Sequence, residues 1–92
     1  YLFYLAQYLQ EGAQELGLSG ELADQLVRAT LRGSGELLAR TELTAGDLRR
    51  QVTSPGGTTQ AAMEVLDTQR VGETVRSALA AGVARSMELG KG

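Results

Sequence analysis

Apolar residues recur at spacings of three and four along most of this chain, which is typical of the buried face of an α-helix. The first such stripe consists of Leu2, Leu5, Leu9, Ala13 and Leu16. Gly17 follows it as a C-terminal cap, and Ser19 can cap the next helix, predicted over residues 20–40. That helix has apolar residues on two sides, so we expect it to be buried on both.

The second half of the chain predicts three further helices. Thr44 and Asp47 form a capping-box-like pair that opens a short helix, AGDLRRQV. A helix over residues 58–69 and a last one over residues 71–89 follow, and Gly90 is expected to end the latter. No stretch of useful length alternates apolar and polar residues as a strand does. The predicted fold class is therefore all-α, with about five helices in one domain spanning residues 1–92.

Small residues lie inside two of the predicted helices. Gly33 and Gly35 stand mid-helix, where a glycine costs about 1 kcal/mol relative to alanine. Phosphate binding is one explanation and close contact with another helix is the other. We favour helix contact, because strong helix formers continue on both sides. Ala78 and Gly82 similarly invite close approach to the last helix.

The composition excludes several kinds of site. The chain has 92 residues with no cysteine and no histidine, so disulfides, thiolate metal sites and a histidine base are all impossible. No acidic run has the spacing of a calcium loop, and no metal site is expected. A net charge of −2, with both signs interspersed, argues against nucleic acid and anionic membranes as partners. A core this small is marginal by itself, which favours burial shared between two chains.

The stretch TSPGGTT (residues 53–59) interrupts the helical pattern. Pro55 lacks an N–H and disfavours helix at Ser54, so the third helix must end near Thr53. Gly56 and Gly57 can adopt backbone angles closed to other residues. Thr58 or Thr59 can then cap the fourth helix, which predicts a turn with outward N–H groups at a helix N-terminus.

Such a turn attracts anions through unpaired N–H groups and the helix dipole. The stretch lacks the lysine of a phosphate-binding P-loop, and the chain has no G-x-G-x-x-G after a strand to bind a dinucleotide. Without a basic side chain in the loop, a carboxylate fits better than a multiply charged phosphate. The residues alone leave open whether this is a carboxylate site or an ordinary capped corner between helices.

Three stretches of the sequence together resemble a known family. VTSPGGTT followed by AAMEVLD, and ARSMELGK near the end, are similar to the C-terminal domain of pyrroline-5-carboxylate reductases. The opening YLFYLAQYLQEGAQELGL resembles the helix that begins the family's dimerisation domain. The resemblance therefore covers essentially the whole chain.

The resemblance implies a function and an assembly. Family members reduce 1-pyrroline-5-carboxylate to L-proline with NADPH or NADH. In the family an N-terminal Rossmann domain binds this cofactor, and that domain is absent from this chain. The chain would then be a C-terminal dimerisation and substrate-binding domain, similar to that of 6-phosphogluconate dehydrogenase and inactive alone. The implied assembly is an intertwined homodimer, with a pentamer of dimers as its further form, and the implied location is cytoplasmic.

The resemblance also implies roles for individual residues. The substrate carboxylate would be held by Ser54, Gly56, Gly57, Thr58 and Thr59. Thr59 would lie near the ring nitrogen as the catalytic residue, acting by hydrogen bonding and positioning because a hydroxyl is a poor acid. Val52 would line the ring pocket, and Glu42 would favour the iminium form of the substrate electrostatically, unless it is simply a solvated residue beside a helix start.

Two alternative functions remain open. The chain could be the helical domain of another Rossmann-linked dehydrogenase, but such domains usually place a catalytic lysine on a helix, and the only lysine is Lys91. It could also be a non-catalytic dimerisation or adaptor module. Tyr1, Tyr4 and Tyr8 form a second stripe on the first helix, which we interpret as core or interface rather than as a ligand site.

Overall fold

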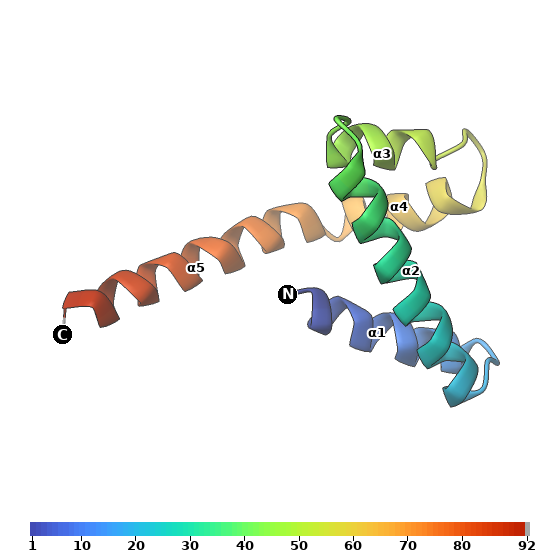
Figure 1. Cartoon of the computed structure of the whole chain (residues 1–92), viewed down its shortest axis with the longest axis horizontal. Helices are drawn as coiled ribbons and strands as arrows, with labels where there is room; N and C mark the ends of the chain where they lie inside the picture. The colour runs from blue at the N-terminus through green and yellow to red at the C-terminus, as the bar shows by residue number, and fades with distance from the viewer. Residues whose placement is uncertain (92) are drawn as a thin grey trace. The chain divides into compact units, whose positions relative to one another are not determined.

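The computed structural model describes residues 1–91 and confirms the all-α prediction (Figure 1). Its five helices are α1 (Leu2–Glu15), α2 (Gly20–Arg40), α3 (Ala45–Gln51), α4 (Thr58–Thr68) and α5 (Val71–Lys91). No strand occurs within that range. The chain divides into two compact units, Tyr1–Leu48 and the residues from Arg49 onward, and each is described by itself.

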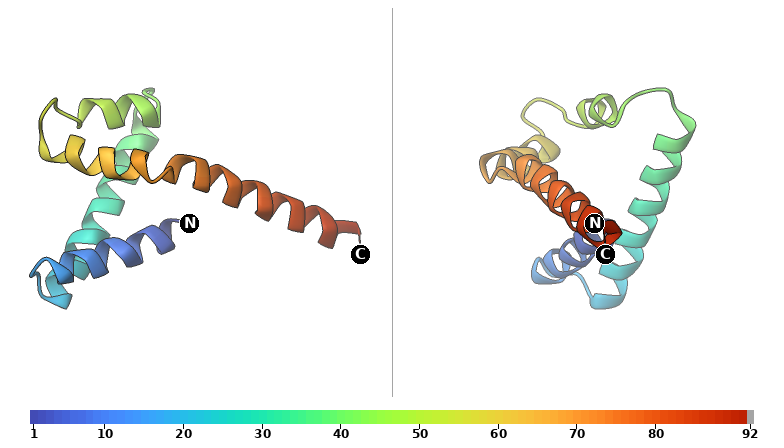
Figure 2. Two further views of the ribbon diagram at one scale, coloured as in Figure 1. Left: turned by 180° about the vertical axis from the view of Figure 1, so that it is seen from behind. Right: turned by 90° about the vertical axis from the view of Figure 1, so that its left-hand side faces the viewer.

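In the first unit, α1 and α2 form a helical hairpin whose turn has the predicted caps (Figure 2). Gly17 has a φ of 111°, its N–H donates to Gln14, and the N–H of Leu18 donates to Ala13. This pair of bonds is the Schellman motif, which needs a left-handed residue such as glycine. The hydroxyl oxygen of Ser19 accepts from the N–H of Leu22 at 3.1 Å and so caps α2.

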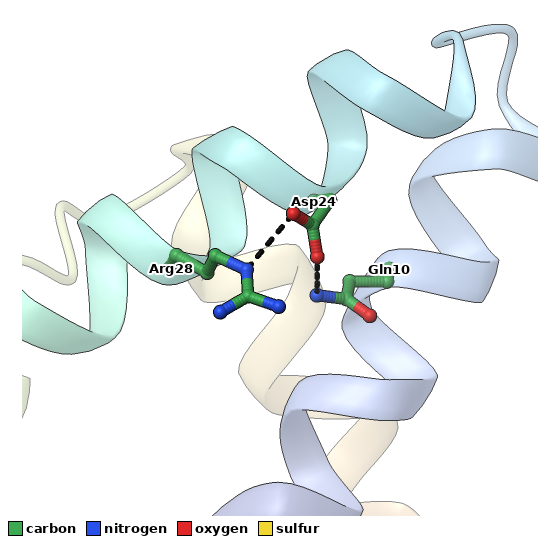
Figure 3. Close-up of polar contacts among 3 residues, drawn as sticks. All are labelled: Gln10, Asp24 and Arg28. Atoms are coloured by element: carbon green, nitrogen blue, oxygen red, sulfur yellow. Dashed lines mark hydrogen bonds and ion pairs between the residues drawn. The ribbon is translucent and has the colours of Figure 1, made fainter.

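A polar link joins α1 to α2, and two residues of α2 are buried (Figure 3 shows the polar link). Ala23 and Val27, both on α2, are the buried apolar residues of the described chain. Gln10 of α1 donates from Nε2 to Asp24 at 2.9 Å, and Arg28 pairs with the other carboxylate oxygen at 2.8 Å. The Asp24 side chain therefore joins the two helices and is itself held by the next turn of α2.

The prediction that α2 is buried on both sides is not met within the described chain. Its leucines at positions 22, 26, 37 and 38 are 41–54% exposed. Added Cβ atoms at Gly33 and Gly35 would meet no atom within 4 Å. The apolar faces of α2 are thus present as predicted but uncovered, and close helix contact at the two glycines stays a prediction about an assembly.

The tyrosine stripe of α1 is likewise exposed. Tyr1, Tyr4 and Tyr8 are 74%, 69% and 52% exposed, so they are not part of the core of this chain. The rings of Tyr4 and Tyr8 meet edge to face with centroids 4.9 Å apart. The pKa of Tyr8 is raised above its ordinary value. The first cause is Tyr4, whose charge interaction and hydrogen bond both favour the neutral phenol of Tyr8, and the next is the negative charge of Glu11 nearby.

The helix α3 opens with the predicted capping box. The N–H of Asp47 donates to the Thr44 hydroxyl at 3.0 Å, and the N–H of Thr44 donates to the Asp47 carboxylate at 3.1 Å. Two helix N–H groups are satisfied reciprocally in this way, which fixes where α3 begins.

In the second unit, α4 turns into α5 through a backbone conformation that the sequence did not indicate. Arg70 has a φ of 56°, although it is not glycine, and its N–H donates to Asp67. Its carbonyl oxygen accepts from both the N–H and the hydroxyl of Thr74, which ties the start of α5 to the turn. Arg70 thus takes the place that a C-terminal glycine cap usually fills.

The helix α5 is one unbroken rod with no buried residue (Figure 2). The prediction that Gly90 ends it is wrong, because α5 continues to Lys91. A glycine stops a helix when it takes a left-handed conformation, and Gly90 is not among the residues with positive φ. No helix in residues 1–91 combines the length and apolarity needed to cross a bilayer.

Candidate functional site

The TSPGGTT loop contains a tight turn closed by its own backbone. The N–H of Gly57 donates to the carbonyl oxygen of Ser54 at 2.9 Å. Pro55 occupies the second position of this turn, and Gly56 occupies the third with a φ of 74°. Proline followed by a residue with positive φ is the signature of a type II turn, so Gly56 is required for its backbone angle.

Gly57 is required for a different reason. Its backbone is extended, with φ −87° and ψ 177°, which any residue can adopt. A Cβ added there would lie 3.1 Å from the carbonyl oxygen of Ser54 and 3.3 Å from its Cβ. The second glycine of the loop therefore allows the close approach of Ser54, while the first supplies the turn.

The start of α4 differs from the prediction. Neither Thr58 nor Thr59 is the N-cap. Gly57 holds that position, and its carbonyl oxygen accepts the first helical bond from Ala61 at 3.2 Å. The reason is that Pro55 and Gly56 complete the turn early enough for Gly57 to leave it already in N-cap geometry. Thr58 and Thr59 become the first two helical residues, where their hydroxyls are not used for capping.

Gln60, which sequence reasoning missed, completes the local structure. Its side-chain oxygen accepts a hydrogen bond from the N–H of Gly56. Gln60 is the third helical residue of α4, the position from which glutamine reaches back in a capping box. The signal in the sequence is a glutamine three residues after Gly57. It predicts Gly57 as the N-cap, whereas the sequence analysis assigned the cap to a threonine.

These bonds determine which donors face away from the loop. The N–H groups of Gly56 and Gly57 are used inside it, by Gln60 and Ser54 respectively. The N–H groups of Thr58, Thr59 and Gln60 have no acceptor within residues 1–91. Three successive N–H groups at the start of a helix are a site for a small anion, favoured further by the helix dipole.

The hydroxyl groups of the loop fall into two sets. Thr53 donates from Oγ1 to the carbonyl oxygen of Arg49 at 2.6 Å, so its proton is used at the end of α3. Within the described chain the hydroxyls of Ser54, Thr58 and Thr59 have no hydrogen-bond partner. Thr59 is half-buried while Ser54 and Thr58 are exposed. Thr59 is thus the hydroxyl with the most restricted surroundings.

A cavity of about 360 Å³ borders the loop in the second unit. It is lined by Arg49, Arg50, Thr53, Gln60, Met63, Glu64 and Asp67. Its lining carries both signs of charge and includes Thr53 of the loop and Gln60 of the first turn of α4.

The remaining predicted site residues are Val52 and Glu42. Val52 directly follows α3 and is 63% exposed, so its side chain is available to line a pocket. Glu42 is exposed in the connection between α2 and α3 and belongs to the first unit. The structure therefore brings together the loop residues from Ser54 to Thr59, and the roles of Glu42 and Val52 stay predictions.

Comparison with known sequences identifies the family. Residues 1–89 match the family described as pyrroline-5-carboxylate reductase dimerisation. The chain belongs to this family. A pyrroline-5-carboxylate reductase from Pseudomonas aeruginosa is 38% identical over 89 residues, which are 97% of this chain and 33% of that protein. The chain thus spans about a third of the length of the curated relatives that it matches.

Two solved structures of pyrroline-5-carboxylate reductases share the fold. The one from Coxiella burnetii has a TM-score of 0.91 and 42% identity, covering 97% of this chain and 33% of that one. The one from Plasmodium falciparum, which has NADP bound, has a TM-score of 0.84 and 30% identity, covering 88% of this chain and 31% of that one. The resemblance inferred from the loop and the C-terminal residues is therefore confirmed for the family and for the fold.

Proposed function

We propose that this chain is the C-terminal part of a reductase that converts 1-pyrroline-5-carboxylate to L-proline with NADPH or NADH. Within that enzyme it would bind the substrate carboxylate and form a homodimer, with a pentamer of dimers as the further assembly and a cytoplasmic location. The observation that carries the proposal is the row of unpaired N–H groups at Thr58, Thr59 and Gln60. Membership of the dimerisation family supports it independently.

The loop suits a carboxylate by geometry and by charge. Three successive N–H groups at a helix start can donate to two carboxylate oxygens, and the helix dipole favours a single negative charge. The loop contains no lysine or arginine between Thr53 and Thr59, so a doubly charged phosphate would be poorly neutralised. A monocarboxylate with a small ring is the ligand class that this combination favours.

The chain's own residues would position the substrate for reduction. With the carboxylate on the start of α4, the hydroxyl of Thr59 would hydrogen-bond the ring nitrogen and fix which face of the C=N bond is presented. Val52 would cover the ring, and the carboxylate of Glu42 would favour the protonated iminium, which is the better hydride acceptor. Thr59 would act by orientation, since the iminium already carries its proton.

The nicotinamide cofactor is not accommodated by this chain. A dinucleotide pyrophosphate site uses a glycine-rich turn between a strand and a helix. Residues 1–91 contain no strand, and the sequence has no G-x-G-x-x-G. The hydride donor would therefore be bound by another part of the protein.

The homodimer is proposed from the apolar surface that the chain leaves uncovered. The helix α5 has no buried residue, and its stripe includes Val71, Val75 and Leu79, which are 38–49% exposed. The uncovered faces of α2 carry further leucines. Covering the exposed half of each such side chain contributes roughly 0.7–1.5 kcal/mol, so a second copy covering these helices would supply the core that one copy lacks.

The experiment that tests the proposal uses the full-length gene product. Oxidation of NADPH and of NADH is followed with 1-pyrroline-5-carboxylate as the substrate, and L-proline is added as a competitor. Turnover that proline inhibits competitively is the expected result. A folded, cofactor-binding protein without turnover would overturn the proposal, and an open reading frame confined to these helices would favour the adaptor alternative.

A further inference from the structure

We propose that Gln60 is a positioning residue of the anion site. We propose also that its neutral amide, in place of a carboxylate, allows the site to bind an anionic ligand. This inference rests on the proposed function, because the ligand considered is the substrate carboxylate. It starts from the hydrogen bond that the Gly56 N–H donates to the Gln60 side-chain oxygen. That contact joins the turn before α4 to the first turn of α4.

Without Gln60 the Gly56 N–H would have no protein acceptor. The turn is closed by Gly57 and Ser54, and that bond uses the Gly57 N–H only. Gln60 therefore adds the second bond that holds the turn, and removal of its acceptor allows the turn to reorient.

The same contact determines how many donors the ligand meets. With the Gly56 N–H held by Gln60, the donors that remain are the successive N–H groups of Thr58, Thr59 and Gln60 itself. These three belong to one helical turn and keep a fixed mutual geometry. Release of the Gly56 N–H would allow the turn to reorient and would disturb the alignment of these three donors, which would weaken binding of the carboxylate.

The charge of the residue matters as much as its reach. Glutamate at this position could accept the same hydrogen bond and would itself interact favourably with the helix dipole. It would also place a negative charge within one helical turn of a bound carboxylate and repel it. Gln60 supplies the acceptor without the charge, so the residue is matched to an anionic ligand.

Two substitutions in the full-length protein separate these effects. Gln60→Met removes the acceptor at similar size, and we expect KM for 1-pyrroline-5-carboxylate to rise about three- to tenfold with kcat little changed, as the loss of one hydrogen bond predicts. Gln60→Glu keeps the acceptor and adds charge, so a similar rise in KM should shrink as salt is added. The rise in Gln60→Met should not depend on salt.

Amide hydrogen exchange gives a readout that does not depend on activity. The Gly56 amide should be protected in the native protein and in Gln60→Glu, and should exchange about three- to tenfold faster in Gln60→Met. Gln69→Met, at the other end of α4, is the matched control and should change neither KM nor exchange at Gly56.

Two results would overturn the inference. One is equal exchange at Gly56 in the native protein and in Gln60→Met, which would show that Gln60 does not hold the Gly56 N–H. The other is an unchanged KM in both Gln60 variants, which would show that this hydrogen bond does not position the ligand. Lack of turnover by the native protein would instead contradict the proposed function, while the exchange comparison would still test the hydrogen bond.

Discussion

The N–H of Gly57 lies 2.9 Å from the carbonyl oxygen of Ser54, and this one bond brings the two ends of the Pro55–Gly56 corner together. Both partners are backbone atoms, so a substitution can disturb the bond only through the backbone angles or through space. The two glycines are sensitive in these two different ways, and the difference can be tested.

At Gly56 the effect of a substitution depends on the backbone angle φ. Gly56→Ala places a side chain at a φ of 74°, which costs about 1 kcal/mol or more in a left-handed conformation. We expect KM for the substrate to rise several-fold, because the turn shifts and α4 loses its aligned donors. Gly56→Asn is the control, since asparagine tolerates this conformation and should cost less. Equal effects of alanine and asparagine would contradict this explanation.

At Gly57 the effect of a substitution depends on the space between its Cα and Ser54. Gly57→Ala puts a Cβ 3.1 Å from a backbone oxygen that cannot rotate away, although the backbone angles of Gly57 suit any residue. We expect Gly57→Ala and Gly57→Asn to be similarly damaging, because both carry the same Cβ. Steady-state kinetics of the four glycine variants would separate the two mechanisms. If asparagine rescued function at Gly57 as well, the close approach of Ser54 would not be the reason for the second glycine.

Thr59 is expected to position rather than to donate a proton. Under the proposed function, Thr59→Ala should lower kcat/KM about two- to tenfold, the effect of one neutral hydrogen bond. Loss of a general acid would cost about a hundredfold or more and would change the pH profile. Thr59→Ser should restore most of the activity, and Thr58→Ala, on the more exposed neighbour, should have the smaller effect. A hundredfold loss with an altered pH profile would assign proton transfer to Thr59.

The features that could be predicted from the sequence are those determined within a few residues. The cap at Ser19, the Gly17 turn and the Thr44–Asp47 box depend on side chains that lie beside the backbone groups they satisfy. The helices α2, α3 and α5 accordingly begin where the pattern placed them, whereas α4 begins with Gly57 as its N-cap instead of a threonine. The position of the loop followed from Pro55 and the glycines for the same reason.

The errors arose where two local signals competed. A threonine beside a helix start usually caps it, but Gly57 took the N-cap because the turn ended one residue earlier. Gln60 was then overlooked, since its role depends on that register. The role of Glu42, which came only from the family resemblance, stays a prediction. What buries the exposed apolar faces of α2 and α5 could not be predicted either, because it lies outside a single copy of the described chain.

Arg70 provides a test of stored backbone strain. It adopts a φ of 56°, a conformation that costs roughly 1–2 kcal/mol for a residue other than glycine. Its ion pair with Glu73 is long, at 3.9 Å, and exposed, so it offsets little of that cost. We expect Arg70→Gly to raise the free energy of unfolding by about 0.5–1 kcal/mol. Arg70→Ala loses the ion pair without relieving the strain and is the control. Denaturant unfolding of both variants is the measurement, and a destabilised Arg70→Gly would contradict the strain argument.

The exposed stripe of α5 gives the sharpest test of the proposed dimer. Leu79 is 46% exposed and lies one turn from Val75 on the same face, whereas Ser77 lies on the opposite face. If a second copy covers the remaining exposed half of this side chain, Leu79→Glu removes apolar burial worth roughly 0.7–1.5 kcal/mol in each of the two copies. Dimer affinity should then fall about tenfold to a hundredfold. Ser77→Glu introduces the same side chain into the same helix and should leave the affinity within about twofold.

Sedimentation equilibrium of the full-length variants over a range of concentrations measures both affinities directly. Circular dichroism serves as the check on helix content, since a glutamate on an exposed helix face does not by itself unfold the helix. Equal weakening by Leu79→Glu and Ser77→Glu would point to general charge repulsion rather than to an apolar interface. Unchanged affinity in Leu79→Glu would place the interface elsewhere, and the leucines of α2 would be the next surface to substitute, because they are exposed to a similar degree.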